Sequence, residues 1–337
     1  MSSPSDALVG CIVGQALGDA LGFVVEAEPP EVAEEYVRGC LLAGRAGERT
    51  PRGFGFGQYT DDTQLARELL RSFAESAGWS PAAFAIRLSD LFRDGLDIGA
   101  GPGTRAAAGR LLHGVPWTES GTPAPYAGNG SAMRAGPLGL LFPGKPDEMQ
   151  RAVREQSRIT HLDPRSAAGA AAVAGAVALA SESGPIVREE FLERLADWTA
   201  PEDASMADAI RGLHEWASLA PDAAAQHLHR AGLDPAHTGA WMGISAFVVP
   251  SVLWSLYAFL RSPDDYWTTV CTAIRVGGDT DTMAAMAGAV SGARLGVAAM
   301  PEPLVQVLND RGTWRAKELA QVARDCARVL TSSGRVL

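Results

Sequence analysis

The chain has 337 residues, of which 47% are hydrophobic and 20% are charged, and its formal net charge is −10. This composition is that of a globular protein, and the length is sufficient to bury a large core. The negative charge excludes general binding to nucleic acid or to an anionic membrane, because both require basic surface. An anionic substrate is still allowed, since bound cations would reverse the sign of the charge locally.

The four cysteines are scattered along the chain without the short spacings of redox or zinc motifs. We therefore expect reduced and mostly buried thiols. The apolar stretch near the N-terminus has no basic flank and is interrupted by Gln15 and Asp19, and the apolar run 166–180 is short and alanine-rich. These features predict no signal peptide, no membrane span and a cytoplasmic location.

In chain order, the first predicted element is a helix over residues 8–21, where apolar residues recur at helical spacing. Gly10, Gly14 and Gly18 recur every four residues within it. Because glycine has no side chain, this stripe predicts a face that a second helix can approach closely.

Amphipathic patterns predict helices along the rest of the chain, and strand signals are scarce. The run 166–181 is small and apolar, which predicts a central helix packed on all sides. The last helix is expected to break near 310–312, and no composition shift or repeat marks a domain boundary, so we predict one all-α domain over 1–337. The other predicted helices are 63–74, 81–92, 103–112, 146–158, 189–199, 204–218, 221–231, 247–260, 264–276, 282–295 and 303–332.

Two acidic motifs each lie immediately before a predicted helix. They are residues 59–64 (YTDDTQ) and residues 276–282 (VGGDTDT). Aspartate and threonine are good N-caps, so helix capping explains either motif alone. However, a cap needs one such residue, whereas each motif supplies two carboxylates and two hydroxyls.

The chemistry of the two motifs together favours a metal centre. If the two helix starts meet, four carboxylates approach one another, which is costly unless cations neutralise them. The donors are all oxygens, with no cysteine or histidine at ligand spacing, which favours Mg²⁺ or Mn²⁺ over zinc. Two separate motifs favour two ions, although one ion would also fit.

These motifs belong to an ordered set that resembles the ADP-ribosylglycohydrolases. The resemblance runs from about residue 10 to residue 296 and implies an orthogonal helical bundle, two Mg²⁺ or Mn²⁺ ions and hydrolysis at the anomeric carbon of the distal ribose. The set comprises residues 14–22 (GQALGDALG) with Glu26 after them, residues 59–63 (YTDDT), residues 128–134 (GNGSAMR), Thr160 and His161 before Asp163 and Pro164, and residues 277–282 (GGDTDT).

The resemblance also assigns roles to single residues. Thr63 and Thr280 are expected to cap the helices or to support the ligands. The metal ligands that it implies are Thr60, Asp61, Asp62, Asp279, Asp281 and Thr282.

Two further carboxylates are candidate catalytic groups. The resemblance places Glu26 near the metal centre and the scissile bond as a gating or general acid/base group; by itself it would be a solvated surface residue. Asp97 resembles a position where arginine-specific members carry a catalytic carboxylate, and its alternative is a turn residue. Cleavage of a glycosidic bond commonly uses one carboxylate to activate water while another group assists the leaving atom.

Two glycine-rich segments are candidates for substrate binding, because backbone N–H groups in such segments can surround a pyrophosphate. His161 is expected either to contact the ribose or to be structural. The residues of the first segment are Asn129, Gly130, Ser131 and Met133, and those of the second are Gly101, Gly103 and Thr104.

We therefore predict a hydrolase that releases ADP-ribose from an ADP-ribosylated protein or a small ADP-ribose conjugate. Asp97 favours an arginine-linked acceptor, and an O-linked acceptor such as serine is the alternative within this class. A two-metal hydrolase of nucleotides or phosphoesters and a non-catalytic binding protein are the alternatives outside it.

Overall fold

Helices provide the regular structure of residues 4–233 and 241–332, the parts of the chain that the computed structural model describes. In these residues, β-type pairing is limited to isolated bridges, such as those of Gln58 with Asn309 and of Gly128 with Phe247. The prediction of an all-α fold is confirmed.

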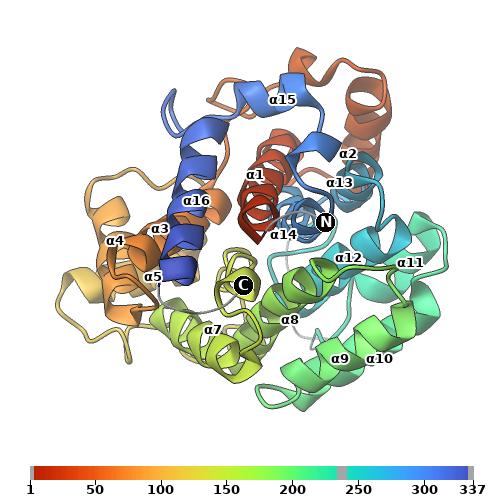
Figure 1. Ribbon diagram of the computed structural model, residues 1–337. Helices are drawn as coiled ribbons and strands as arrows, with labels where there is room; N and C mark the ends of the chain where they lie inside the picture. Colours follow the sequence, from red (N-terminus) through yellow and green to blue (C-terminus); the bar gives the residue numbers. More distant parts are fainter. Residues whose placement is uncertain (1–3, 234–240, 333–337) are drawn as a thin grey trace.

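The helices surround a central pair. In Figure 1, α1 and α14 lie side by side at the centre, α3, α4 and α5 lie on one side, and α9 and α10 form the opposite edge. In chain order the α-helices of the described residues are α1 (Pro4–Gly22), α2 (Pro30–Tyr36), α3 (Asp61–Glu75), α4 (Pro81–Arg93), α5 (Pro102–Leu112), α6 (Leu138–Leu141), α7 (Pro146–Thr160), α8 (Pro164–Ala180), α9 (Arg188–Thr199), α10 (Ala204–Trp216), α11 (Pro221–Leu228), α12 (Val248–Arg261), α13 (Tyr266–Ile274), α14 (Thr280–Leu295), α15 (Glu302–Val307) and α16 (Ala316–Ser332).

The predicted helices are all present, with ends that differ by a few residues. The last one is broken as expected, and it forms α15 and α16. Sequence reasoning missed α2, α6 and the π-helical turn η2 (Val37–Leu41), because each is too short to show an apolar period. Both α3 and α14 begin two residues earlier than predicted, which places part of each acidic motif in the first helical turn.

Helices α1 and α14 run antiparallel and touch through small residues. A Cβ atom added at Gly10 would lie 2.1 Å from the carbonyl oxygen of Gly292, and one added at Gly18 would lie 2.0 Å from that of Ala284. No side chain fits in such spaces, so the predicted close approach along the glycine stripe is confirmed. The antiparallel arrangement brings the C-terminal end of α1 to the N-terminal end of α14, where the second acidic motif lies.

The core is built mainly from α1, α8, α12 and α14. All residues of α8 except Pro164, Arg165 and Ala178 are buried, as predicted for a central helix. Among the described residues, Pro4–Val25 is the one helical segment long and apolar enough to cross a membrane, and 94% of its most apolar window is buried inside the molecule. Three of the four cysteines are buried and all four are free, as predicted.

Candidate metal centre

The ends of α1, α3 and α14 bring acidic side chains together in two groups. In the first group, carboxylate oxygens of Asp19, Asp62 and Asp281 all lie within 4.8 Å of one another. In the second group, the same limit holds for Glu26, Asp279 and Asp281. Because Asp281 belongs to both groups, the two acidic motifs form one continuous cluster.

The electrostatics of this cluster fit a bound cation. Asp62 Oδ2 and Asp281 Oδ1 are buried and have no hydrogen-bond partner in the described residues. Burial, followed by the negative charge of neighbouring carboxylates such as Asp19, raises the pKa of Asp62 well above its usual range. Burial and the charge of Glu26 do the same to the pKa of Asp281. Hard cations are held by oxygen ligands of this kind and relieve such repulsion.

Asp19 is the centre of the junction at the start of α3. Its Oδ1 accepts hydrogen bonds from the Thr60 N–H (2.9 Å) and hydroxyl (3.0 Å), and its Oδ2 accepts from the Thr63 N–H (3.1 Å) and hydroxyl (2.6 Å). Burial raises the pKa of Asp19 to about 7, although these hydrogen bonds act in the opposite direction. Sequence reasoning gave Asp19 no role in the site, although a lone aspartate within an apolar helix was a signal for one.

Backbone contacts and Asn129 hold Asp279. The Asp279 N–H donates to the carbonyl of Ile244 at 2.7 Å, and the Asn129 side-chain amide donates to Asp279 Oδ2 at 2.5 Å. Gly278 has a φ of +82°, and a Cβ atom there would lie 2.1 Å from the Ile244 carbonyl oxygen. The structure thus places Asn129, predicted as a substrate-binding residue, in contact with a predicted metal ligand.

The two threonines of α14 point in different directions. The Thr280 hydroxyl donates to the Gly22 carbonyl at 2.8 Å, which ties α14 to α1 as predicted for a supporting residue. The Thr282 hydroxyl donates to Asp62 Oδ1 at 3.2 Å, which links the two acidic motifs directly.

Glu26 lies beside the second motif, as predicted. The Ala27 N–H donates to the Gly278 carbonyl at 2.8 Å, and this contact fixes the chain next to Glu26 against the glycine turn. The side chain is half-buried, so it can be reached from solvent. Burial and then the charges of Asp279 and Asp19 raise the pKa of Glu26 to about 7.

Asp61 and Asp97 lie together at the edge of the cluster. Asp61 belongs to neither group of converging carboxylates, and its N–H donates to the Ile98 carbonyl at 2.7 Å. Burial is the main cause that raises the pKa of Asp61, and the charge of Asp97 is among the further causes. Asp97 forms an ion pair with Arg105 at 2.7 Å. The structure therefore brings the predicted catalytic Asp97 to the edge of the acidic cluster.

The two glycine-rich segments contact each other. A Cβ atom added at Gly130 would lie 2.9 Å from the Thr104 hydroxyl oxygen and 2.9 Å from a ring carbon of His161. The Gly103 N–H donates to the Tyr126 hydroxyl at 3.2 Å, and the Tyr126 ring stacks on His161 with 5.8 Å between centroids. Residues predicted separately as substrate-binding thus form one continuous wall.

Several side chains in this wall point inward. His161 is buried, its Nδ1 lies 2.8 Å from the Thr160 hydroxyl, and burial lowers the pKa of His161 to about 3. The Ser131 hydroxyl donates to the Ser166 carbonyl at 3.0 Å, and Met133 is also buried. Because the side chains of His161, Ser131 and Met133 are buried under the loop, a contact of these residues with substrate would have to come from their backbone groups.

Comparison with known proteins accounts for this arrangement. The sequence model of the family described as ADP-ribosylglycohydrolase matches residues 1–335. The chain belongs to the ADP-ribosylglycohydrolase family. The resemblance found in the motifs is thereby confirmed. Membership supports an enzyme that hydrolyses ADP-ribose linkages.

Individual relatives match this chain along most of their length. An uncharacterized protein of Archaeoglobus fulgidus is 31% identical, with 89% of this chain and 91% of the relative covered. The ADP-ribosyl-[dinitrogen reductase] glycohydrolase of Rhodospirillum rubrum is 28% identical (89% and 90% covered), and the human ADP-ribosylhydrolase ARH3 is 29% identical (87% and 86% covered). A solved structure described as an ADP-ribosylglycohydrolase-related protein complex aligns with a TM-score of 0.69 and 26% identity, over 98% of this chain and 99% of that one.

Proposed function

We propose that the protein is a metal-dependent hydrolase that cleaves the glycosidic bond between ADP-ribose and an arginine side chain of a modified protein. The observation that carries this proposal is the position of Asp97. This carboxylate stands at the edge of the acidic cluster, beside Asp61, and it already binds a guanidinium group, that of Arg105. The same carboxylate can bind the guanidinium of an arginine acceptor.

The acidic cluster is the proposed site of two divalent cations, Mg²⁺ or Mn²⁺. Asp62, Asp279 and Asp281 would hold them, and the two geometric groups add Asp19 and Glu26 to the candidate ligands. Thr60, Asp61 and Thr282 stay predicted ligands. Divalent cations supply Lewis-acid polarisation of the oxygen atoms that they contact.

The wall of glycine-rich segments is the proposed binding surface for the pyrophosphate and adenosine. Among the described residues, the N–H groups of Gly130 and Ser131 donate to no other group, so they can donate to phosphate oxygens. Asn129 keeps the Asp279 carboxylate oriented through its 2.5 Å hydrogen bond. The distal ribose of a bound substrate would then lie between the wall and the cluster.

Glu26 is the proposed proton-transfer group. It is the half-buried member of the cluster, whereas Asp279 and Asp281 are buried, so it alone of this group can exchange protons with solvent directly. A general acid/base must stand within reach of the reacting atoms, and a ribose bound against the cluster would bring these atoms to Glu26. Asp97 would orient the acceptor on the other side of the scissile bond.

An O-linked acceptor such as serine, or a small ADP-ribose conjugate, is the second candidate, and the same ion pair favours it. As long as Arg105 occupies Asp97, the carboxylate is neutralised and an uncharged acceptor fits better than a cation. The Arg105 side chain is 52% exposed, and its guanidinium also donates to the Ala100 carbonyl at 2.8 Å, so moving aside breaks this hydrogen bond as well as the ion pair. The acceptor therefore depends on whether Arg105 leaves Asp97.

The test is release of free ADP-ribose from an ADP-ribosyl-arginine protein and from an ADP-ribosyl-serine peptide, with Mg²⁺, with Mn²⁺ and with a chelator. We expect metal-dependent release from the arginine substrate, and a faster rate for Arg105→Ala because Asp97 is then free. Arg93→Ala, which removes an exposed arginine of α4, is the matched control. Release from the serine peptide alone would establish the second candidate, and release of phosphate would contradict both.

A further inference from the structure

The loop of residues 309–314, between α15 and α16, has an uncommon backbone conformation. Arg311 and Trp314 have φ values of +48° and +45°, and Gly312 has a φ of +81°. L-residues rarely adopt this region, and bulky ones such as tryptophan least of all. Such a conformation persists only where the surroundings fix it, and such conformations cluster near functional sites.

One set of contacts joins this loop to the segment that leads into α3. The Tyr59 N–H donates to the Asn309 carbonyl at 3.3 Å, and the Tyr59 hydroxyl donates to the Trp314 carbonyl at 2.8 Å. The Arg311 N–H donates to the Gln58 side-chain oxygen at 2.8 Å. The loop therefore fixes the first residue of the first acidic motif, Tyr59, and the residue before it, Gln58.

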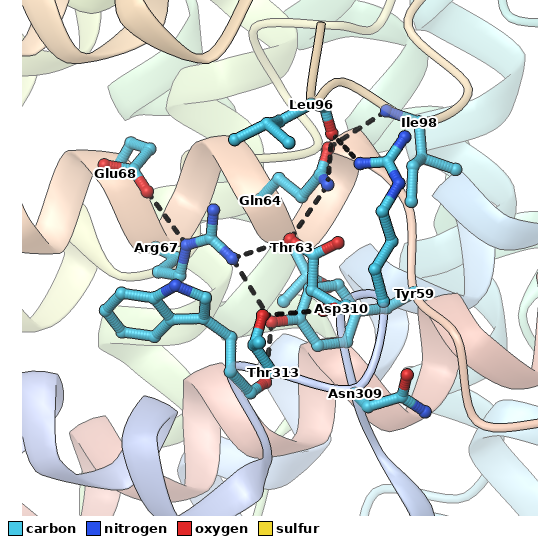
Figure 2. A network of polar contacts seen from close by, with 12 residues as sticks. Tyr59, Thr63, Gln64, Arg67, Glu68, Leu96, Ile98, Asn309, Asp310 and Thr313 are labelled. Carbon is cyan, nitrogen blue, oxygen red and sulfur yellow. Dashed lines mark hydrogen bonds and ion pairs between the residues drawn. The ribbon is translucent and has the colours of Figure 1, made fainter. Parts of the chain in front are cut away.

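A second set of contacts joins the loop to residues 96–98. The Gln64 amide donates to Asp310 Oδ2 at 3.0 Å and to the Leu96 carbonyl at 3.0 Å. Its oxygen accepts from the Ile98 N–H at 3.1 Å. The Arg311 guanidinium also donates to the Leu96 carbonyl. Figure 2 shows Gln64 between the two segments, with every polar atom of its side chain in use.

Buried charges hold the loop itself in place. Arg67 donates to Asp310 Oδ2 at 2.9 Å, and both residues are buried. The guanidinium of Arg67 lies 4.7 Å from the centroid of the Trp314 ring, and that of Arg71 lies 4.9 Å from it. An ion pair and two cation–π contacts thus anchor the loop on α3, the helix that carries the first motif.

Residues 96–98 connect this network to the acidic cluster. Asp97 lies between the two residues that Gln64 contacts, and the Ile98 carbonyl accepts the hydrogen bond from Asp61. The segment that carries Asp97 is therefore held next to Asp61 with support from a distant part of the chain, since Gln64 and Asp310 are 246 residues apart.

We propose that the 309–314 loop is a positioning element of the active site, and that Gln64, Asp310 and Arg311 act through it as positioning residues for Asp97 and Asp61. The inference rests on the proposed function, because its kinetic effect is defined for ADP-ribose release. Its structural effect, the order of residues 96–98, can be measured without any activity.

The first experiment compares Arg311→Ala with Arg315→Ala, a control at an exposed arginine of the same connection. Alanine keeps the Cβ atom, so the backbone strain at residue 311 is unchanged and only the contact with Leu96 is lost. We expect kcat for ADP-ribose release to fall about 10-fold in Arg311→Ala, because small displacements of catalytic groups have effects of this order. KM and the thermal midpoint are expected to match those of Arg315→Ala.

The second experiment removes the bridge itself. Gln64→Met keeps the side-chain length but cannot form the hydrogen bonds to Asp310, Leu96 and Ile98. We expect a fall of about 100-fold in kcat. Gln321→Met, at an exposed glutamine of α16, is the control.

Amide hydrogen exchange of the same variants gives a measurement besides activity. We expect faster exchange at Asp61 and Ile98 in Arg311→Ala and Gln64→Met, with α1 and α14 unchanged. Wild-type exchange and kcat in both variants would overturn the inference, and so would a uniform rise in exchange, which would show a general loss of stability. Absence of ADP-ribose release from the wild-type protein would contradict the proposed function, and the exchange data would still decide the positioning role.

Discussion

The start of α3 and the start of α14 are held in place by different kinds of contact. Both place acidic residues in a first helical turn, and both contribute to one cluster. At α3 a buried side chain, Asp19, accepts four hydrogen bonds from Thr60 and Thr63. At α14 no side chain caps the helix, and the backbone contact of Asp279 with Ile244 fixes the turn.

Because of this difference, the two helix starts are expected to respond differently to single substitutions. A junction held by side chains loses its support when one carboxylate changes, whereas a junction held by the backbone depends on glycines that permit the turn. At the second junction, Gly277 and Gly278 have φ values of +71° and +82°. Side-chain substitutions at the start of α3 are therefore expected to lower the free energy of unfolding, whereas those at the start of α14 are expected to reduce mainly the activity.

The largest effect is expected where both junctions share a residue. Asp281 belongs to both carboxylate groups, so Asp281→Asn should impair both proposed cation sites. We expect turnover to fall about 1000-fold or more, as for loss of a group central to catalysis. Mn²⁺ binding measured by electron paramagnetic resonance should weaken at the same time. Near wild-type turnover in this variant would remove the argument for a metal centre.

The next largest effect is expected on stability, and it should be larger at the start of α3 than at the start of α14. Asp19→Asn leaves buried donors of the α3 junction facing an amide NH₂ group, and we expect a loss of about 2–3 kcal/mol in the free energy of unfolding. Asn129→Ala removes the hydrogen bonds of the Asn129 amide to Asp279 and, at the longer distance of 3.3 Å, to the Ser251 hydroxyl, and we expect a loss of only about 1 kcal/mol together with reduced turnover. Urea unfolding measures both. Equal losses of stability would show that the two junctions depend equally on their side chains.

The smallest effect distinguishes two threonines within α14. Thr280→Val loses the bond to the Gly22 carbonyl, and we expect a loss of about 1 kcal/mol in stability with turnover retained. Thr282→Val loses the bond to Asp62 and a predicted metal ligand, so turnover should fall about 10-fold in addition to a similar loss of stability. A fall in turnover for Thr280→Val, with none for Thr282→Val, would show that the roles of the two threonines have been assigned wrongly.

The sequence predicts those parts of the molecule that leave a local pattern. Apolar periodicity located the long helices, and the two acidic motifs located the cluster. The partners of Gln64 and the ion pair of Asp97 with Arg105 were not predictable, because they depend on packing between distant segments that leave no local signal. The short helices α2 and α6 were missed for lack of length. One domain over 1–337 and a cytoplasmic location stay predictions.

The glycine contact between α1 and α14 should be a frequent site of inactivating mutations. It sets the distance between Asp19 of α1, which holds the start of α3, and the second acidic motif at the start of α14, although the glycines themselves supply no ligand. A Cβ atom at Gly14 would lie 2.4 Å from the Gly288 carbonyl oxygen, so even alanine there must push the helices apart or shift their register. In a screen for inactive variants, we therefore expect substitutions along this stripe to be recovered as mutants with weak affinity for the proposed cations, although no candidate ligand has been changed.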